Sequence, residues 1–224
     1  MDVSNLSEAP TLTVKDKMMQ EIRAKIKKVI NKYFQGRDYE KENVNLWKDY
    51  AMEELTDFLK LNYKEYGFGI YIIIIKKGDI RSNCISISRG DTDFDLVEFL
   101  DAKTMYTEIR INLNKIYNNQ TNYLNSCNEK LVMEMNKMLN SKLEGKQYSY
   151  DFAKGKTDEI VNELEKYLLI PNPRPCSYHI CSILSKPCIY QFDYKIVNLK
   201  YIPIISCYSN DSLYCQLILF ILDN

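Results

Sequence analysis

The sequence of 224 residues contains one pattern twice, and this repeat constrains the fold more than any other feature. Residues 103–117, KTMYTEIRINLNKIY, predict a strand, because their apolar side chains alternate with the period of two that strand geometry requires. Residues 211–222, DSLYCQLILFIL, repeat the small polar residue, the bulky apolar residue, the Tyr and the apolar strand after it. A unit that recurs within one chain predicts two modules in tandem.

Two further segments upstream support the repeat. Residues 34–39, FQGRDY, match residues 143–148, LEGKQY. The spacing from Gly36 to Gly145 differs by one residue from the spacing between Tyr106 and Tyr214, as a single loop deletion would produce. Each copy therefore has the order helix, G-x-x-Y turn, helix and then several strands.

The predicted fold class is α+β, with two tandem modules that each have two helices followed by an antiparallel sheet of about four strands. We expect a disordered tail at 1–13 and the first module at 14–117. The Asn-rich segment 118–128 has the composition of a linker, and the second, more divergent module follows at 129–224.

Helices in the first copy are predicted at 14–34 and 44–61, where apolar residues recur every three or four positions. Gly36 is expected to end the first helix and Asn43 to cap the second, while Trp47 is assigned to the core. First-copy strands are predicted at 70–75, 80–88 and 103–117. The strand at 70–75 is apolar on both faces, so it is expected to be central in its sheet. Residues 77–79 are predicted to form the tight turn of a hairpin, and residues 89–93 a loop.

Helices in the second copy are predicted at 129–143 and from Asp151, as the N-cap, to 169. Three prolines at 171, 173 and 175 prevent the second helix from continuing. Second-copy strands are predicted at 177–184, 189–194, 195–205 and 211–222. Pro203 makes the third of these an edge strand or ends it early, since proline cannot donate a hydrogen bond to a ladder.

Composition excludes several classes of function. Lys and Arg number 30, Asp and Glu number 30, and the sequence pI is near 6.6, so no basic field attracts nucleic acid or an anionic membrane. The apolar runs at 70–75 and 217–222 are too short to cross a bilayer, and the polar start lacks the pattern of a signal peptide. We therefore expect a cytoplasmic protein without nucleic-acid or membrane partners. The two glycine-rich motifs that bind nucleotide phosphates, G-x-x-x-x-G-K-[ST] and G-x-G-x-x-G, do not occur in the sequence.

Seven cysteines and one histidine supply the only alternative chemistry. No C-x-x-C pair is present, so we interpret the cysteines as reduced thiols that serve as small apolar residues. His179 and Cys181 fall on one face of a strand, and a packed strand histidine is favoured over a nucleophile pair. We expect no catalytic residue, no metal and no cofactor. A metal or thiol protein that uses Cys176, His179, Cys181 and Cys188 remains the alternative class.

Five motifs of the first copy occur in a characteristic order. They are the G-x-x-Y turn from Gly36 to Tyr39, Trp47, the apolar strand 71–75, the turn Lys77-Gly78 and the K-T-M-Y run at 103–106. With these motifs the first copy resembles the Tctex-type dynein light chains. The resemblance covers 14–117 and, more weakly, 129–222. The sequence departs from the family at 87–90, where the usual Trp-Asp is absent, and the second copy has Lys156 and Pro187 where the first has Trp47 and Gly78.

This resemblance implies a non-catalytic dynein light chain or adaptor. Such light chains are homodimers that exchange a strand and bind a disordered segment of a dynein intermediate chain along a sheet edge. Two fused copies are then expected to form an intrachain pseudo-dimer with strand exchange, with further homo-oligomers left open. The implied setting is the cytoplasm and the cytoskeleton, within the dynein complex, with a cilium or flagellum as the alternative.

A strand at a sheet edge offers unpaired backbone donors and acceptors to an added strand. The alternative with the same fold is a peptide-binding scaffold unrelated to dynein, whose partner is another disordered peptide or a cargo protein. The residues predicted to bind the partner peptide lie on two strands, Ile80, Arg81, Ser82, Asn83, Cys84, Ile85, Ser86, Ile87 and Ser88 in the first copy and Cys188, Ile189, Tyr190, Gln191, Phe192 and Tyr194 in the second.

Overall fold

A computed structural model describes seven stretches of the chain. They are residues 13–76, 80–87, 94–115, 128–169, 176–187, 191–197 and 200–223. Four predicted segments lie wholly or mostly outside the described residues. They are the tail at 1–13 except residue 13, the turn at 77–79, the loop at 89–93 and the linker at 118–128 except residue 128.

Each copy has two helices followed by four strands, so the predicted α+β class is confirmed. The first copy contains α1 (Val14–Tyr33), α2 (Lys41–Asn62), β1 (Tyr66–Lys76), β2 (Ile80–Ile87), β3 (Phe94–Asp101) and β4 (Met105–Lys115). The second copy contains α3 (Asn128–Leu143), α4 (Tyr150–Leu169), β5 (Cys176–Ser185), β6 (Gln191–Val197), β7 (Lys200–Ser209) and β8 (Tyr214–Asp223).

Two predicted helix caps and one strand boundary are wrong. Helix α2 begins before Asn43, whose side-chain amide donates to the carboxylate of Glu40, the N-cap residue. In α4 the hydroxyl of Ser149, not Asp151, accepts the backbone N–H of Phe152 at 3.2 Å. The predicted break after Tyr194 falls inside β6. Short polar residues near a helix start compete for the cap, and local sequence does not decide which one wins.

The strands form two antiparallel four-stranded sheets that exchange one strand. Their orders are β3-β4-β1-β6 and β2-β5-β8-β7. Strand β6 of the second copy therefore pairs with β1, and β2 of the first copy pairs with β5. The predicted hairpin between 70–75 and 80–88 is wrong, because β1 and β2 belong to different sheets. Since β2 and β6 follow equivalent strands in the two copies, each can fill the other's place.

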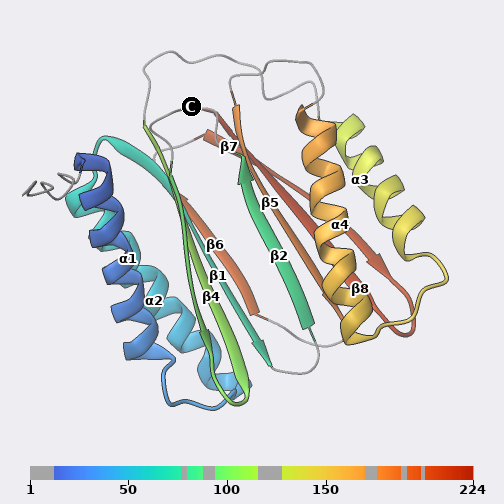
Figure 1. Ribbon diagram of the computed structural model, residues 1–224, viewed down its shortest axis with the longest axis horizontal. Helices are drawn as coiled ribbons and strands as arrows, with labels where there is room; N and C mark the ends of the chain where they lie inside the picture. The colour runs from blue at the N-terminus through green and yellow to red at the C-terminus, as the bar shows by residue number, and fades with distance from the viewer. Residues whose placement is uncertain are drawn as a thin grey trace, which may run out of the picture.

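The molecule has four layers, with a helix pair on each outside and the two sheets between them (Figure 1). Helices α1 and α2 cover the outer face of the first sheet, and α3 and α4 cover the outer face of the second. Apolar residues on both faces of β1 fit this arrangement, since one face meets the helices and the other meets the second sheet. Its predicted central place, between β4 and β6, is confirmed.

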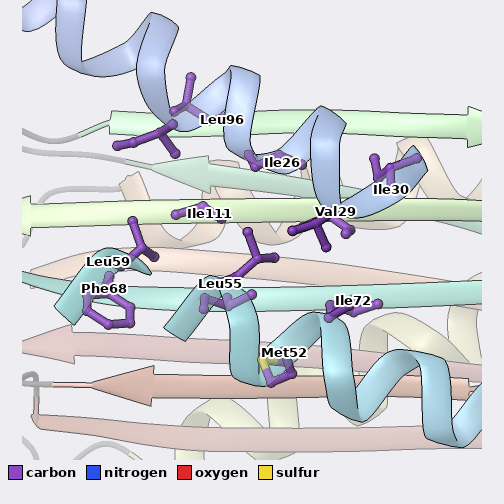
Figure 2. Packing of buried hydrophobic residues seen from close by; sticks show 14 of the residues in the cluster. Ile26, Val29, Ile30, Met52, Leu55, Leu59, Phe68, Ile72, Leu96 and Ile111 are labelled. Atoms are coloured by element: carbon purple, nitrogen blue, oxygen red, sulfur yellow. The ribbon is translucent and has the colours of Figure 1, made fainter. Parts of the chain in front are cut away.

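The outer core of the first copy joins both helices to the sheet (Figure 2). Val29 of α1, Leu55 of α2 and Ile72 of β1 are all fully buried there. Each such side chain contributes about 1.5–3 kcal/mol relative to an exposed one. Trp47 of α2 is buried too, as predicted, and the guanidinium of Arg37 lies 4.6 Å from its ring centre.

A third core fills the space between the two sheets. It contains Tyr71, Ile73 and Ile75 of β1, Cys181 and Ile183 of β5, and Ile218 and Phe220 of β8. Gly69 leaves room for the ring of Tyr71, because a Cβ at this position would lie 2.8 Å from the Tyr71 hydroxyl. The two copies are therefore joined by exchanged strands and by a shared apolar layer.

The repeated sequence motifs make the same contact in both copies. The backbone N–H of Tyr39, in the first G-x-x-Y turn, donates to the hydroxyl of Thr104 at 2.9 Å. In the second copy the N–H of Tyr148 donates to the hydroxyl of Ser212 at 2.8 Å. The turn between the two helices is thus fastened to the turn before the last strand, which explains why both motifs carry a small hydroxyl residue.

We expect Thr104→Val to lower the free energy of unfolding by about 1–2 kcal/mol, measured by urea denaturation. The substitution preserves the shape of the side chain but leaves the Tyr39 N–H without its acceptor, and it removes the bond from Thr104 to the Asp38 carboxylate at 2.9 Å. Lys103→Ala, at an exposed neighbouring position, is the control and should change little. Equal stability of the two variants would contradict this role.

Candidate functional site: the free edges of the sheets

Both strands predicted to bind a peptide lie at a sheet edge. Strands β3 and β6 are the edges of the first sheet, and β2 and β7 are the edges of the second. The predicted edge position of the strand with Pro203 is also confirmed, although β7 continues past this proline to Ser209. The exchanged strands are thus not enclosed within the sheets, and one long side of each is open to pairing.

The register decides which backbone groups of β6 face outward. The N–H of Ala102 donates to the carbonyl of Met105 at 2.9 Å, so this is a hydrogen-bonded pair. Hydrogen-bonded and non-hydrogen-bonded pairs alternate along an antiparallel ladder. The pairing registers run without interruption from β3 through β4 and β1 to β6, so they carry this alternation across the whole sheet. On β6, the N–H and carbonyl groups of Phe192, Tyr194 and Ile196 therefore point away from β1. These groups form the outer edge of β6.

The same reasoning applies to the second sheet. The N–H of Asn210 donates to the carbonyl of Leu213 at 2.9 Å, which sets the alternation through β8, β5 and β2. The outward backbone groups of β2 are those of Ile80, Ser82, Cys84 and Ser86. On β7 the outward set includes Pro203, which has no N–H to offer. The β7 edge therefore lacks one of its donors.

The free edge of β6 already carries a side-chain acceptor. The Oδ1 atom of Asp193 accepts the outward N–H of Tyr194 at 2.8 Å. Its Oδ2 atom lies 3.4 Å from the Nζ atom of Lys48, on α2. The Lys48 side chain is only 12% exposed, so helix and strand hold the carboxylate between them. We call this arrangement of Lys48, Asp193 and the Tyr194 N–H the Asp193 cap.

The sequence analysis missed Asp193 and Lys48. Asp193 lies between Phe192 and Tyr194, which were both predicted to bind the peptide, but was itself left out of the predicted set. Lys48 follows Trp47 on a helix and resembles any solvated lysine. A carboxylate on the helix-facing side of a strand was the available signal, since such a group requires a cation on the helix above it. Its partner could not be identified before the strand exchange was known.

The structure separates the predicted site residues into three groups. Residues 80–87 and 191–192 are placed on edge strands by their backbone. The ring of Tyr194 packs inside the sandwich, with its centre 4.6 Å from that of Phe220, and burial raises its pKa. Its backbone, not its side chain, is thus the part available at the edge. Ser88, Cys188, Ile189 and Tyr190 lie outside the described residues.

The alternative Cys/His chemistry finds little support among the described residues. His179 is fully buried, as predicted, and its ring stacks on Tyr71 with the centres 3.9 Å apart. Cys181 is disulfide-bonded, so the prediction of a reduced thiol there is wrong, and the register places Cys84 opposite it in a non-hydrogen-bonded pair. Two of the described cysteines, Cys207 and Cys215, are free thiols. Across the described ranges, no group of three or more His, Cys, Asp and Glu residues could hold a metal ion.

Charged residues line part of the layer between the sheets. The Nη1 atom of Arg110, on β4, lies 3.0 Å from Oδ2 of Asp95, and its Nη2 atom lies 3.7 Å from Oε1 of Glu108. Burial, followed by the positive charge of Arg110, holds the pKa of His179 well below its usual value of 6.5. The imidazole is therefore neutral in the folded protein.

No protein-family model matches this sequence, and no curated protein matches it either. Within the described part of the chain, no helix is long and apolar enough to cross a membrane.

His179 makes stability depend on pH. Below pH 6.5 an unfolded chain protonates this histidine while the folded chain does not, so the free energy of unfolding should fall by up to about 1.4 kcal/mol per pH unit. His179→Phe keeps a ring against Tyr71 and should lose this part of the slope. Urea denaturation between about pH 7.5 and about pH 5.5 measures it. Identical slopes for the two proteins would contradict a neutral buried imidazole.

Proposed function

We propose that this protein is a non-catalytic binding module that takes up an extended peptide segment as an added strand at the edge of an exchanged strand. The position of β2 and β6, each at the edge of the other copy's sheet, is the observation that carries the proposal. The outward N–H and carbonyl groups recur at every second residue of both strands, which is the spacing that an incoming strand needs.

The surroundings of the two edges favour peptide binding. Helix α2 lies over β6 and helix α4 lies over β2, so each edge is flanked on its outer side by a helix. Side chains of an added strand would alternate between this helical side and the side of the facing sheet. Backbone pairing then supplies affinity, and the helix supplies selectivity. The fusion of two copies makes strand exchange intramolecular, so the platform does not depend on protein concentration.

The resemblance of the first copy to Tctex-type light chains suggests the partner. On this proposal the bound peptide is a disordered segment of a dynein intermediate chain, and the protein acts as a light chain or adaptor of that motor on the cytoskeleton. A second candidate keeps the fold and the binding mode but takes a different disordered peptide. Recovery of intermediate chain from a native lysate supports the first candidate. Enrichment of another partner without intermediate chain supports the second.

The binding mode is tested at Ser82, whose N–H faces outward on β2. We expect Ser82→Pro to weaken binding of a synthetic dynein intermediate-chain peptide by about tenfold or more, because proline removes one edge donor and its ring obstructs the next strand. Fluorescence anisotropy with a labelled peptide measures the dissociation constant.

Ser82→Ala is the matched control, since it retains the backbone N–H, and it should bind like the unaltered protein. Circular dichroism verifies that both variants fold. Equal affinity of the proline and alanine variants would refute strand addition at β2.

A further inference from the structure

We infer that β2 is the exchanged strand that receives the partner, and that the Asp193 cap closes the corresponding edge of β6. The inference rests on the proposed function, which treats the two edges alike. It adds that the pseudo-symmetric chain binds one peptide per molecule at these edges, because neutral residues replace the charged pair of the cap at the matching positions of β2 and α4.

The cap acts on the middle of the β6 edge. Phe192, Tyr194 and Ile196 face outward, and the Tyr194 N–H is the central donor of the three. Asp193 Oδ1, at 2.8 Å, already accepts the hydrogen that this N–H would donate to a carbonyl oxygen of an added strand. Charged side chains on an edge strand are one way in which proteins prevent edge strands from pairing.

Lys48 makes the cap difficult to displace. The carboxylate uses one oxygen for the Tyr194 N–H and the other for Lys48, so both of its oxygens are engaged. An added strand would replace a charged acceptor by a neutral carbonyl, which forms the weaker hydrogen bond. It would also separate the carboxylate from a lysine whose side chain is largely buried. Asp49 is a poor substitute, because its Oδ1 atom lies 3.8 Å from the same Nζ atom and its side chain is 65% exposed.

The residues of β2 that match Asp193 and Tyr194 in register are uncharged. Tyr194 pairs with Tyr71 on β1, and Cys84 pairs with Cys181 at the corresponding position of β5. The residue before Cys84 is Asn83, which carries no charge.

The helix above β2 differs in the same way. Gly36 and Gly145 are equivalent residues of the two copies and lie 109 positions apart. At the same separation, Lys48 of α2 corresponds to Thr157 of α4. Thr157 is buried, and its hydroxyl donates to the carbonyl of Ala153 at 3.0 Å. A neutral residue thus stands where the first copy has the cation that holds the cap.

Amide hydrogen exchange tests the cap without any partner. We expect the Tyr194 N–H to exchange about fivefold to tenfold faster in Asp193→Ala than in the unaltered protein, as loss of one hydrogen bond implies. Asp49→Ala is the matched control, because it removes the other carboxylate near Lys48 without touching the edge, and it should leave the Tyr194 rate unchanged. Equal rates in all three proteins would overturn the cap.

Calorimetry with the same intermediate-chain peptide tests the choice of edge. The unaltered protein and Asp49→Ala should bind one peptide per chain and protect β2 amides, whereas Asp193→Ala should bind two and also protect Tyr194 and Ile196. Two peptides on the unaltered protein, or protection of β6 alone, would overturn the inference while leaving strand addition intact. Absence of binding in every variant would refute the dynein intermediate chain as the partner and β2 as its site, and the exchange rates would still judge the cap.

Discussion

The backbone pairing of β6 with β1 and of β2 with β5 is the interaction on which the rest of this structure depends. Each sheet is completed by a strand from the other copy, so neither sheet has four strands without that exchange. The shared core around Tyr71 and Phe220 forms between the faces that this exchange brings together. Because both copies belong to one chain, the pairing has the high effective concentration of an intramolecular step.

Exchange also determines which groups remain available. Strands β1 and β5 become interior strands, and the outward-facing backbone groups move to β2 and β6. Such edges attract unwanted pairing as readily as a proper partner, so proteins restrict them. Here β7 has Pro203 among its outward residues, and β6 carries the Asp193 carboxylate on its outward N–H. On the inference above, these restrictions leave β2 as the receptive exchanged strand.

The two copies keep the contacts that build the fold and differ in the contacts at the edges. Thr104 and Ser212 fasten equivalent turns, and Gly36 and Gly145 share a positive φ, of 73° and 68°, after the first helix of each copy. At the edges, by contrast, Lys48 of the first copy corresponds to the buried Thr157 of the second. A duplicated chain can vary the charged residues of one edge without disturbing the scaffold, because Asp193 and Lys48 are not members of the apolar cores.

The repeat, the order of helices and strands, the buried Trp47, the packed His179 and the edge position of Pro203 all follow from the sequence, because periodicity, glycine and proline act over a few residues. Only the tertiary structure decided that β2 leaves β1 for the other sheet, since a local pattern describes a strand's faces but not its partner. The pairing of Asp193 with Lys48 likewise depended on that choice, because it joins a strand of one copy to a helix of the other.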